Sequence, residues 1–378
     1  MLVWVEKNKN CSIIRTLVLG LYVITQQTKG VGCSVRLVHC GPKFLSIYKT
    51  PHDASRKVLS RVGFAGDFLM VRRDFLKTSI IAGTIAVCET PGALAQEQAT
   101  ENNGMPRLVP PAKPAELNLC LQYGAIPGAE MKEKLDFLEA NGFASVETGG
   151  GDWLINNADA LAKELEGRKL FVSAVCAGYK GDFASADQAT RRLAVDSCKP
   201  LLEKAGMLKS CGLIVCPARR NVGMAFPELR DDFVKNTGRE LAEHAVKFNT
   251  SIVLEPLQRS ETMFLRLVAD GAAIARDIGP GCTVMGDFWH MSKEENSFMG
   301  AFLSAGKLLS HVHIASLKGR QIPGVDGSAD NYTDGFKGLK LLGYRGAVSL
   351  EGGFPKDSDR KQLILNMVKL LREQWIVA

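Results

Sequence analysis

Excess positive charge is absent from most of this chain, although the whole sequence of 378 residues has a formal net charge of +7. Residues 1–95 contain 13 Lys and Arg against 5 Asp and Glu, whereas residues 96–378 contain 34 against 35. The basic excess therefore belongs to the N-terminal quarter, and the remainder has a net charge of −1. Because nucleic-acid-binding surfaces need clustered Lys and Arg, we expect no nucleic acid partner.

Histidine and paired cysteine are also scarce after residue 95. Only four histidines occur there, which argues against a site with two or three zinc ions: His244, His290, His311 and His313. The six cysteines of this part form no CxxC pair, so neither a zinc knuckle nor a redox motif is predicted. No apolar run of about 20 residues, the length of a membrane-spanning helix, follows residue 95. We therefore expect a soluble mature protein with no stable membrane span.

A segment typical of protein export lies inside the N-terminal quarter. Residues 70–95 begin with Met70 and combine Arg72-Arg73, a short apolar stretch and the small-residue end Ala93-Leu94-Ala95. A charged head, an apolar middle and a small-x-small end are the three parts of an export signal. The paired arginines followed by Phe-Leu-Lys resemble a twin-arginine signal. This resemblance implies the twin-arginine export machinery as a partner.

An export signal works only near an N-terminus. We therefore predict that residues 1–69, which show no clear helical or strand period, are a mis-assigned extension. The alternative is an internal amphipathic segment of a real domain. Residues 96–116, polar and rich in Pro, Asn and Ala, are predicted to be a linker. The expected location is the periplasm or the exterior, after folding in the cytoplasm; without a working signal the protein would stay cytoplasmic.

From residue 117 onward, short apolar runs alternate with longer amphipathic ones. Eight runs are strand candidates: 117–121, 144–146, 170–175, 212–215, 251–254, 283–285, 309–314 and 347–350. Helix candidates between or after them include 130–141, 158–167, 186–210, 229–248, 271–278 and 357–374. Strands alternating with helices at about 30 residues per unit indicate a parallel sheet. Eight units predict one α/β domain over residues 117–378, a closed eight-fold β/α (TIM) barrel.

An open doubly wound sheet is the alternative architecture. It predicts a glycine-rich phosphate turn after the first strand. The stretch 122–129, Gln-Tyr-Gly-Ala-Ile-Pro-Gly-Ala, is a poor match to G-x-G-x-x-G. The closed barrel is therefore favoured.

Four neighbouring strand candidates end in side chains that bind metals. Functional groups of a β/α barrel lie at the C-terminal ends of its strands. The last four strands supply, in order, Glu255, Asp287, His313 and Glu351. Buried carboxylates so close together would repel one another, and a divalent cation is the simplest way to neutralise them. Three carboxylates and one imidazole suit Mn²⁺, our first choice, with Mg²⁺, Co²⁺ and Zn²⁺ as alternatives.

Some residues at these strand ends also fit structural roles that involve no metal. An acid at a strand end often caps the next helix, and Asp287 stands three residues before His290 as such a cap would. In the run His311-Val-His313, residues two apart face the same way, and we favour His313 as the ligand because it lies nearer the C-terminal end. His311 is then a hydrogen-bonded core histidine. Glu147, at the end of the second strand, fits substrate contact and helix capping equally.

Four sequence pieces resemble the xylose-isomerase-like barrel superfamily, and within it the ketose 3-epimerase and hydroxypyruvate isomerase group. They are Glu255-Pro-Leu-Gln-Arg-Ser-Glu261-Thr, Gly286-Asp287-Phe-Trp-His290-Met, His311-Val-His313-Ile-Ala-Ser-Leu-Lys-Gly-Arg320 with Pro323-Gly324, and Ser349-Leu-Glu351-Gly-Gly. The resemblance covers the barrel, roughly residues 117–375.

The resemblance implies roles for individual residues. It implies that Glu255, Asp287, His313 and Glu351 bind one divalent metal ion, and that Glu261, His290 and Arg320 hold substrate oxygens. It also implies a homo-oligomer. Two positions depart from relatives: Gln258 stands where Asn is frequent, and His313 stands where hydroxypyruvate isomerases tend to have Gln, which favours an epimerase-type site.

The residue types also indicate a reaction. A metal chelated by a carbonyl and the adjacent hydroxyl stabilises the enediolate formed when a proton leaves the neighbouring carbon. Two carboxylates on opposite sides of a bound sugar can remove that proton and return it. We predict that Glu255 and Glu351 are this catalytic pair. Return to the same carbon is epimerisation, and return to the neighbouring carbon is isomerisation. The expected substrate is a small ketose or hydroxy-keto acid such as hydroxypyruvate.

Three other functions remain open on the sequence. A keto-sugar or inosose dehydratase would share the proton abstraction and differ only in the fate of a β-hydroxyl. A phosphodiesterase like the zinc-dependent abasic-site endonucleases is disfavoured by the few histidines and the charge of −1. A non-catalytic periplasmic sugar-binding protein would not need two bases around a metal.

Overall fold

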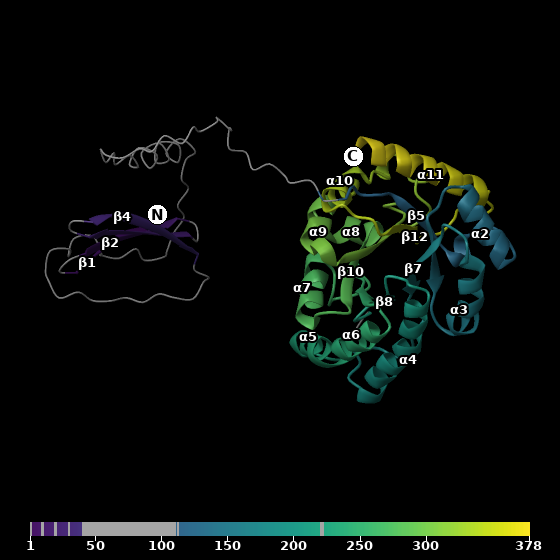
Figure 1. The fold of residues 1–378 in the computed structure, drawn as a ribbon, viewed down its shortest axis with the longest axis horizontal. Coiled ribbons are helices and arrows are strands. Elements are labelled where there is room, and N and C mark those ends of the chain that lie inside the picture. The colour runs from purple at the N-terminus through teal and green to yellow at the C-terminus, as the bar shows by residue number, and fades with distance from the viewer. Residues whose placement is uncertain are drawn as a thin grey trace. The chain divides into compact units, whose positions relative to one another are not determined.

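The computed structural model describes Pro111, residues 113–219 and 223–378, and four strands within residues 2–39 (Figure 1). The chain divides into two compact units, residues 1–101 and 102–378. The predicted export signal, residues 70–95, and most of the predicted linker lie outside the described residues.

Residues 2–39 contain strands that the sequence pattern did not predict. β1 (Leu2–Asn8), β2 (Cys11–Val18), β3 (Leu21–Thr28) and β4 (Val31–His39) form one sheet in the order β1-β2-β3-β4. All three pairings are antiparallel. These segments are rich in Val, Ile, Leu and Thr, and β-branched residues favour strands. The predicted mis-assignment of residues 1–69 stays a prediction.

Residues 102–378 contain the predicted closed barrel of eight parallel strands, in the order β10-β11-β12-β5-β6-β7-β8-β9. The strands are β5 (Asn118–Gln122), β6 (Ser145–Gly149), β7 (Phe171–Cys176), β8 (Leu213–Val215), β9 (Ile252–Leu254), β10 (Cys282–Asp287), β11 (Leu309–Ile314) and β12 (Ala347–Leu350). Each coincides with a predicted strand to within a few residues, so the eight-fold β/α fold is confirmed and the open sheet is wrong.

Helices surround the barrel (Figure 1). They are α2 (Met131–Ala140), α3 (Asp152–Leu165), α4 (Gln188–Met207), α5 (Phe226–Asp232), α6 (Gly238–Lys247), α7 (Val268–Ile278), α8 (Phe288–Glu294), α9 (Phe298–Ala305), α10 (Thr333–Leu342) and α11 (Arg360–Val377). A short π-helix, Phe233–Thr237, joins α5 to α6. Short 3₁₀ turns cover Tyr123–Ala125, Gly306–Leu308 and Gly327–Ala329.

The start of α3 and the end of the linker differ from the prediction. Helix α3 begins at Asp152, six residues before the predicted start at residue 158, because Gly151 adopts a φ of 71° and turns the chain directly after β6. The end of the predicted linker packs on the barrel. The Glu116 amide donates to the Tyr344 carbonyl at 2.9 Å, and the Glu116 carboxylate pairs with Arg345 at 2.5 Å.

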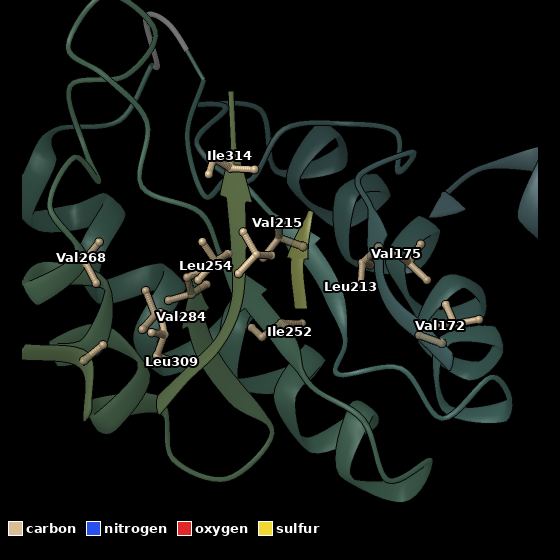
Figure 2. Close-up of a cluster of buried hydrophobic side chains, with 14 of the residues drawn as sticks. Val172, Val175, Leu213, Val215, Ile252, Leu254, Val268, Val284, Leu309 and Ile314 are labelled. Atoms are coloured by element: carbon tan, nitrogen blue, oxygen red, sulfur yellow. The ribbon is translucent and has the colours of Figure 1, made fainter. Parts of the chain in front are cut away.

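The main hydrophobic core lies between the strands and the helices. Strand residues such as Val284, Leu309 and Ile314 are buried there (Figure 2). The barrel interior is different. Four apolar side chains from neighbouring strands form a small separate cluster: Ala174, Ile214, Val253 and Met285. The remaining interior contains polar contacts between strands that are not neighbours, for example Cys120 on β5 with Ser173 on β7 at 3.3 Å.

An aromatic cluster ties α8, α10 and α11 together, and it gives a stability prediction. Phe336 is fully buried, and its ring centroid lies 6.0 Å from that of Phe288 and 5.3 Å from that of Trp375. Phe336→Ala leaves a cavity, so we expect the free energy of unfolding to fall by about 3–5 kcal/mol in urea titration. Leu341→Ala, at a 41% exposed position of the same helix, is the control and should change it by about 0.5 kcal/mol or less. Equal losses in the two variants would contradict the packing argument.

Candidate active site

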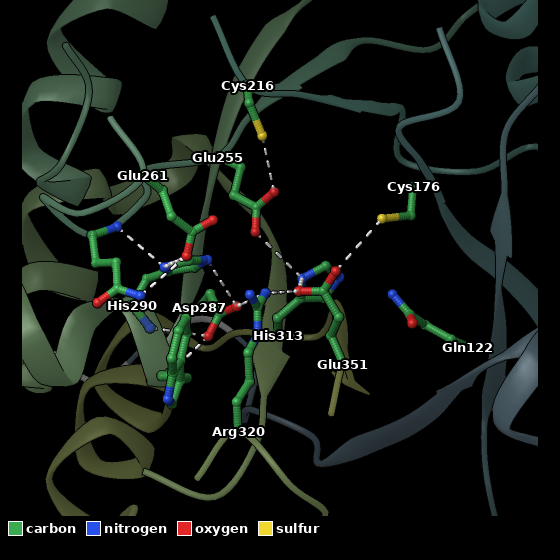
Figure 3. Close-up of polar contacts among 12 residues, drawn as sticks. Gln122, Cys176, Cys216, Glu255, Glu261, Asp287, His290, His313, Arg320 and Glu351 are labelled. Atoms are coloured by element: carbon green, nitrogen blue, oxygen red, sulfur yellow. Dashed lines mark hydrogen bonds and ion pairs between the residues drawn. The ribbon is translucent and has the colours of Figure 1, made fainter. Parts of the chain in front are cut away.

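The four predicted metal ligands meet at the C-terminal end of the barrel. Asp287 is the last residue of β10 and pairs in register with His313 of β11, while Glu255 and Glu351 directly follow β9 and β12. One ligand atom from each of the four residues lies within 4.8 Å of those from the others. Figure 3 shows the three carboxylates turned toward His313. The closed sheet therefore brings together side chains that are up to 96 residues apart in the sequence.

Burial and like charge dominate the electrostatics of this four-residue cluster. Asp287 is 1% exposed, and burial together with the charge of Glu351 raises its pKa to about 7. Burial works against the ionised form of Glu351 as well, but the charges of His313 and Arg320 outweigh it and lower that pKa to about 2. For His313, burial alone would lower the pKa, yet the charges of Glu147 and Glu351 raise it well above its usual value.

Two buried atoms of the cluster have no hydrogen-bond partner among the described residues. They are Glu255 Oε1 and His313 Nδ1, which lie 3.7 Å apart. The same His313 Nδ1 is 3.1 Å from Glu351 Oε2. Buried polar atoms are nearly always satisfied in native proteins. Three carboxylates and an imidazole nitrogen converging within 4.8 Å are a donor set for a divalent cation, so the residues fit the metal that the sequence predicted.

Asp287 both caps a helix and faces the cluster. Its Oδ1 accepts hydrogen bonds from the amides of Trp289 at 2.7 Å and His290 at 3.3 Å, which starts α8. Its Oδ2 lies 3.5 Å from Arg320 Nη2 on the cluster side. The capping explanation and the ligand prediction therefore apply to different oxygens of one carboxylate.

The three predicted substrate-binding residues lie beside the cluster. Arg320 Nη2 is 2.7 Å from Glu351 Oε2, and its guanidinium stacks over Trp289 at 4.5 Å from the ring centroid. His290 is buried, and its Nδ1 accepts a hydrogen bond from the Gln258 amide at 3.1 Å. Its Nε2, 3.8 Å from Asp287 Oδ2, has no hydrogen-bond partner in the described part of the chain.

Glu261 completes this group through Gln258. The Gln258 side-chain amide donates to Glu261 Oε1 at 3.1 Å, and Glu261 Oε1 lies 3.9 Å from His290 Nδ1. Gln258, at the position where relatives often have Asn, therefore links His290 to Glu261, two of the predicted substrate-binding residues. The roles of these residues toward a substrate stay predictions, but the structure places all three at the site.

Glu147 plays a part that neither sequence interpretation anticipated. It is fully buried, and its carboxylate lies 2.8 Å from His311 Nε2 and 3.0 Å from His313 Nε2. Burial alone would raise the pKa of Glu147, but the charge of His313 and hydrogen bonds from both imidazoles hold it well below its usual value. Gln122 also donates to it, at 2.9 Å. His311 and His313 are two residues apart on one strand, so both face the barrel interior. A buried carboxylate that contacts both imidazoles could have been expected from this spacing.

Two cysteine thiols contact the predicted catalytic carboxylates. Cys216 Sγ lies 3.3 Å from Glu255 Oε2, and Cys176 Sγ lies 3.9 Å from Glu351 Oε1. Burial, followed by nearby carboxylates, raises the pKa of both thiols well above the usual value, so they are neutral donors. Their contacts arise because β7 and β8 end at the same rim as β9 and β12.

Other candidates have different surroundings. Phe288 is buried in the aromatic core. Trp289 stacks on Arg320, and Trp153 lies 4.6 Å from Tyr123, ring centroid to ring centroid. Arg219, a few residues after β8, is exposed.

A cavity of about 440 Å³ opens beside the cluster. It is lined by Gln122, Tyr123, Gly124, Ala125, Gly149, Cys176, Glu351, Gly352, Phe354 and Arg360. These residues come from the ends of β5, β6, β7 and β12 and from the segments that follow β5 and β12. Only Glu351 belongs to both the cavity and the cluster. Pockets of about 300–1,000 Å³ are the usual size for small-molecule sites.

The chain belongs to the xylose isomerase-like TIM barrel family, whose sequence pattern matches residues 135–374. It is 28% identical to the 3-dehydro-D-guloside 4-epimerase of Escherichia coli (strain K12) over 229 residues, which cover 58% of this chain and 86% of that protein. It is 35% identical to the D-psicose 3-epimerase of Agrobacterium fabrum over 112 residues, which cover 29% of this chain and 38% of that protein.

Solved structures agree on the fold. The apo crystal structure of the 3-keto-D-glucoside 4-epimerase from E. coli superposes with a TM-score of 0.62 at 25% identity, over 68% of this chain and 100% of that one. A D-psicose 3-epimerase crystallised in the presence of D-fructose superposes with a TM-score of 0.59 at 19% identity, over 68% of this chain and 99% of that one. Within the described residues, no helix is both long and apolar enough to cross a bilayer.

Proposed function

We propose that this protein is a metal-dependent sugar epimerase or isomerase that acts beside a ketone carbon. The observation that carries the proposal is the cluster of Glu255, Asp287, His313 and Glu351, whose ligand atoms lie within 4.8 Å of one another. The epimerase activity of the relatives supports it. A divalent metal held by these four residues would polarise the ketone and the adjacent hydroxyl, which makes the intervening C–H bond acidic enough to break.

The two glutamates are arranged to move a proton. In each glutamate, one carboxylate oxygen faces His313 Nδ1. The distance to this nitrogen is 3.1 Å from Glu351 Oε2 and 3.7 Å from Glu255 Oε1. The other oxygen of each faces a neutral thiol. One of the two, as a carboxylate, removes the proton from the carbon beside the ketone, and the other, as a carboxylic acid, gives its proton to the opposite face of the resulting enediolate. After turnover the first glutamate is protonated and the second is ionised. The product is an epimer at that carbon.

The neighbouring polar residues orient the substrate. Arg320 is positively charged and reaches both Glu351 and Asp287, so it sits where negative charge develops on substrate oxygens. His290 Nε2 and the carboxylate of Glu261 supply a donor and an acceptor for hydroxyl groups on the same side. The two curated relatives act by epimerisation, which we favour here over the isomerisation of hydroxypyruvate.

Solvent exchange with and without metal tests the proposal. The full chain is stripped of metal, resupplied with Mn²⁺, Mg²⁺, Co²⁺ or Zn²⁺ and incubated in D₂O with ketoses, 3-keto-glucosides, hydroxypyruvate and inososes. We expect metal-dependent deuterium uptake at the carbon beside the ketone and a new epimer in the NMR spectrum. Removal of the metal should abolish the exchange.

The outcomes separate the alternatives. Deuterium uptake with loss of a hydroxyl group would identify a dehydratase. Turnover of hydroxypyruvate alone would favour the isomerase. Full exchange in the metal-free protein, or no exchange on the whole panel, would overturn the proposal.

A further inference from the structure

The loop between β11 and α10, residues 315–332, carries Arg320 to the cluster (Figure 3). Arg320 has a backbone φ of 51°, in the left-handed region that residues other than glycine seldom adopt. Such a conformation costs free energy and persists only where the surrounding contacts hold it. Arg320 Nη2 lies 2.7 Å from Glu351 Oε2 and 3.5 Å from Asp287 Oδ2. The contacts that hold this loop therefore decide where the guanidinium stands.

A tight turn from Ser316 to Gln321 contains Arg320. The Ser316 amide donates to the Gln321 carbonyl at 2.7 Å, and the Arg320 amide donates to the Ser316 carbonyl at 3.1 Å. The Ser316 hydroxyl accepts from the Gln321 amide at 3.0 Å. Outside the turn, the Gly353 amide donates to the Arg320 carbonyl at 2.9 Å. Because Gly353 is two residues beyond Glu351, the turn is joined to the segment that supplies the carboxylate partner of Arg320.

Asp326 holds this turn from outside it. Its Oδ2 accepts hydrogen bonds from the amides of Lys318 and Gly319, both at 2.9 Å. These two residues directly precede Arg320. Burial alone would raise the pKa of Asp326, but hydrogen bonds, chiefly from the Gly319 amide, lower it below the usual value, so the carboxylate is ionised at neutral pH. Hydrogen bonds to an ionised acceptor are stronger than those between neutral groups.

Asp330 supports the rest of the loop. It is 2% exposed, and its Oδ1 accepts from the Leu317 amide at 2.9 Å. Its Oδ2 accepts from the Gly324 amide at 2.6 Å and from the Asp326 amide at 3.3 Å. Three amides on one buried carboxylate make Asp330 necessary for the loop as a whole. The half-buried Asp326 side chain accepts from the turn that carries Arg320, so it is the position at which this turn can be altered selectively.

We propose that Asp326 is a positioning residue for the reaction: it holds the turn that places Arg320, and so fixes the guanidinium beside Glu351 before a substrate binds. The inference rests on the proposed function, in which Arg320 faces the negative charge that develops on substrate oxygens. A charge aimed in advance at that point needs no reorganisation during the reaction. Asp326 acts through the backbone amides before Arg320 and contributes no group to the chemistry itself.

The Trp289 ring provides a readout that needs no substrate. The Arg320 guanidinium stacks over it at 4.5 Å from the ring centroid. Protons above an aromatic ring resonate upfield, so the Nε–H signal of Arg320 reports the position of the guanidinium. The full chain is labelled with ¹⁵N-arginine and loaded with diamagnetic Mg²⁺, and Arg320→Lys assigns the signal by removing it. We expect Asp326→Ala to move the signal toward the range of solvent-exposed arginines. Asp326→Asn keeps an oxygen for the two amides and should move it less.

Kinetics test the consequence for the reaction. Deuterium uptake by the metal-loaded full chain is measured on D-psicose, D-fructose and methyl 3-keto-glucoside, and the fastest of these substrates is used for the variants. We expect Asp326→Ala to lower kcat by about 10–100-fold with a smaller change in KM, because a charge aimed at the transition state is displaced. Asp326→Asn should recover most of this loss. In an Arg320→Ala background, Asp326→Ala should lower kcat by a further factor of about two or less, since nothing is left to position.

Asp187→Ala is the matched control. Asp187 also accepts from two backbone amides, those of Ala189 at 3.3 Å and Thr190 at 3.0 Å, but it caps α4. We expect this variant to keep wild-type exchange and an unchanged Arg320 signal. The melting temperature of each variant establishes that it is folded. Asp326→Ser, whose short side chain cannot reach both amides, replaces Asp326→Ala if the latter does not fold.

The outcomes distinguish this inference from the proposed function. A folded Asp326→Ala protein with wild-type kcat, or with the Arg320 signal in its wild-type position, would overturn the inference and leave the epimerase function standing. Equal losses of kcat from Asp326→Ala with and without Arg320 would also overturn it, because the effect would then not pass through the arginine. No metal-dependent exchange by the wild type on these substrates, nor on the wider panel, would overturn the function and the inference with it.

Discussion

Replacing Glu351 by glutamine is expected to reduce deuterium exchange into the substrate by about 10²–10⁴-fold, the usual contribution of a general acid or base. The amide keeps the shape of the side chain and one oxygen, but it cannot take or return a proton. The same loss is expected for Glu255→Gln, because both carboxylates face His313 Nδ1 from the ends of different strands. Exchange is measured by NMR in D₂O at saturating metal.

Metal binding must be followed in the same variants, since Glu255 and Glu351 are also predicted ligands. Calorimetric titration with Mn²⁺ shows whether the glutamine variants still load the ion, and activity is compared only at full occupancy. Glu240→Gln, on the surface in a salt bridge with Arg192, is the matched control and should retain wild-type exchange. Full activity in both loaded active-site variants would show that neither carboxylate is the acid or base.

Replacing Glu147 by leucine is expected to lower the stability of the protein strongly. The substitution leaves His311 Nε2 and His313 Nε2, now at 2.8 Å and 3.0 Å from Glu147, without an acceptor inside the barrel. Removing one partner of a buried charged pair costs about 3–5 kcal/mol. We therefore expect the free energy of unfolding, measured by urea titration, to fall by that amount.

The same substitution should weaken metal binding. By accepting from Nε2–H, Glu147 leaves Nδ1 of His313 as the atom facing Glu255 and Glu351. Loss of such an orienting carboxylate typically lowers metal affinity by about 10–100-fold. Glu147→Gln keeps an acceptor oxygen and should lie between leucine and wild type in both measurements.

A surface position provides the control for Glu147. Glu164→Leu makes the same change on α3, where the side chain is 42% exposed, and should alter neither stability nor Mn²⁺ affinity appreciably. If Glu147→Leu is as stable as the control and binds Mn²⁺ equally well, Glu147 does not orient His313.

The barrel and the members of the cluster follow from the sequence alone. Each strand is a short apolar run, and the alternation with amphipathic helices is a local pattern that needs no knowledge of distant contacts. Parallel strands of a β/α barrel all end at one rim. Knowing where β9, β10, β11 and β12 end was therefore enough to bring Glu255, Asp287, His313 and Glu351 together before any coordinates were considered.

The contacts between side chains across the barrel, in contrast, follow only from the tertiary structure. His311 and His313 reach Glu147 over separations of 164 and 166 residues, and Cys216 reaches Glu255 over 39. These contacts depend on the register of the closed sheet and on how far each side chain extends inward, and a local pattern encodes neither. The cavity beside Glu351 arises in the same way, because its open space is shared by four strand ends whose distance apart is set by barrel closure.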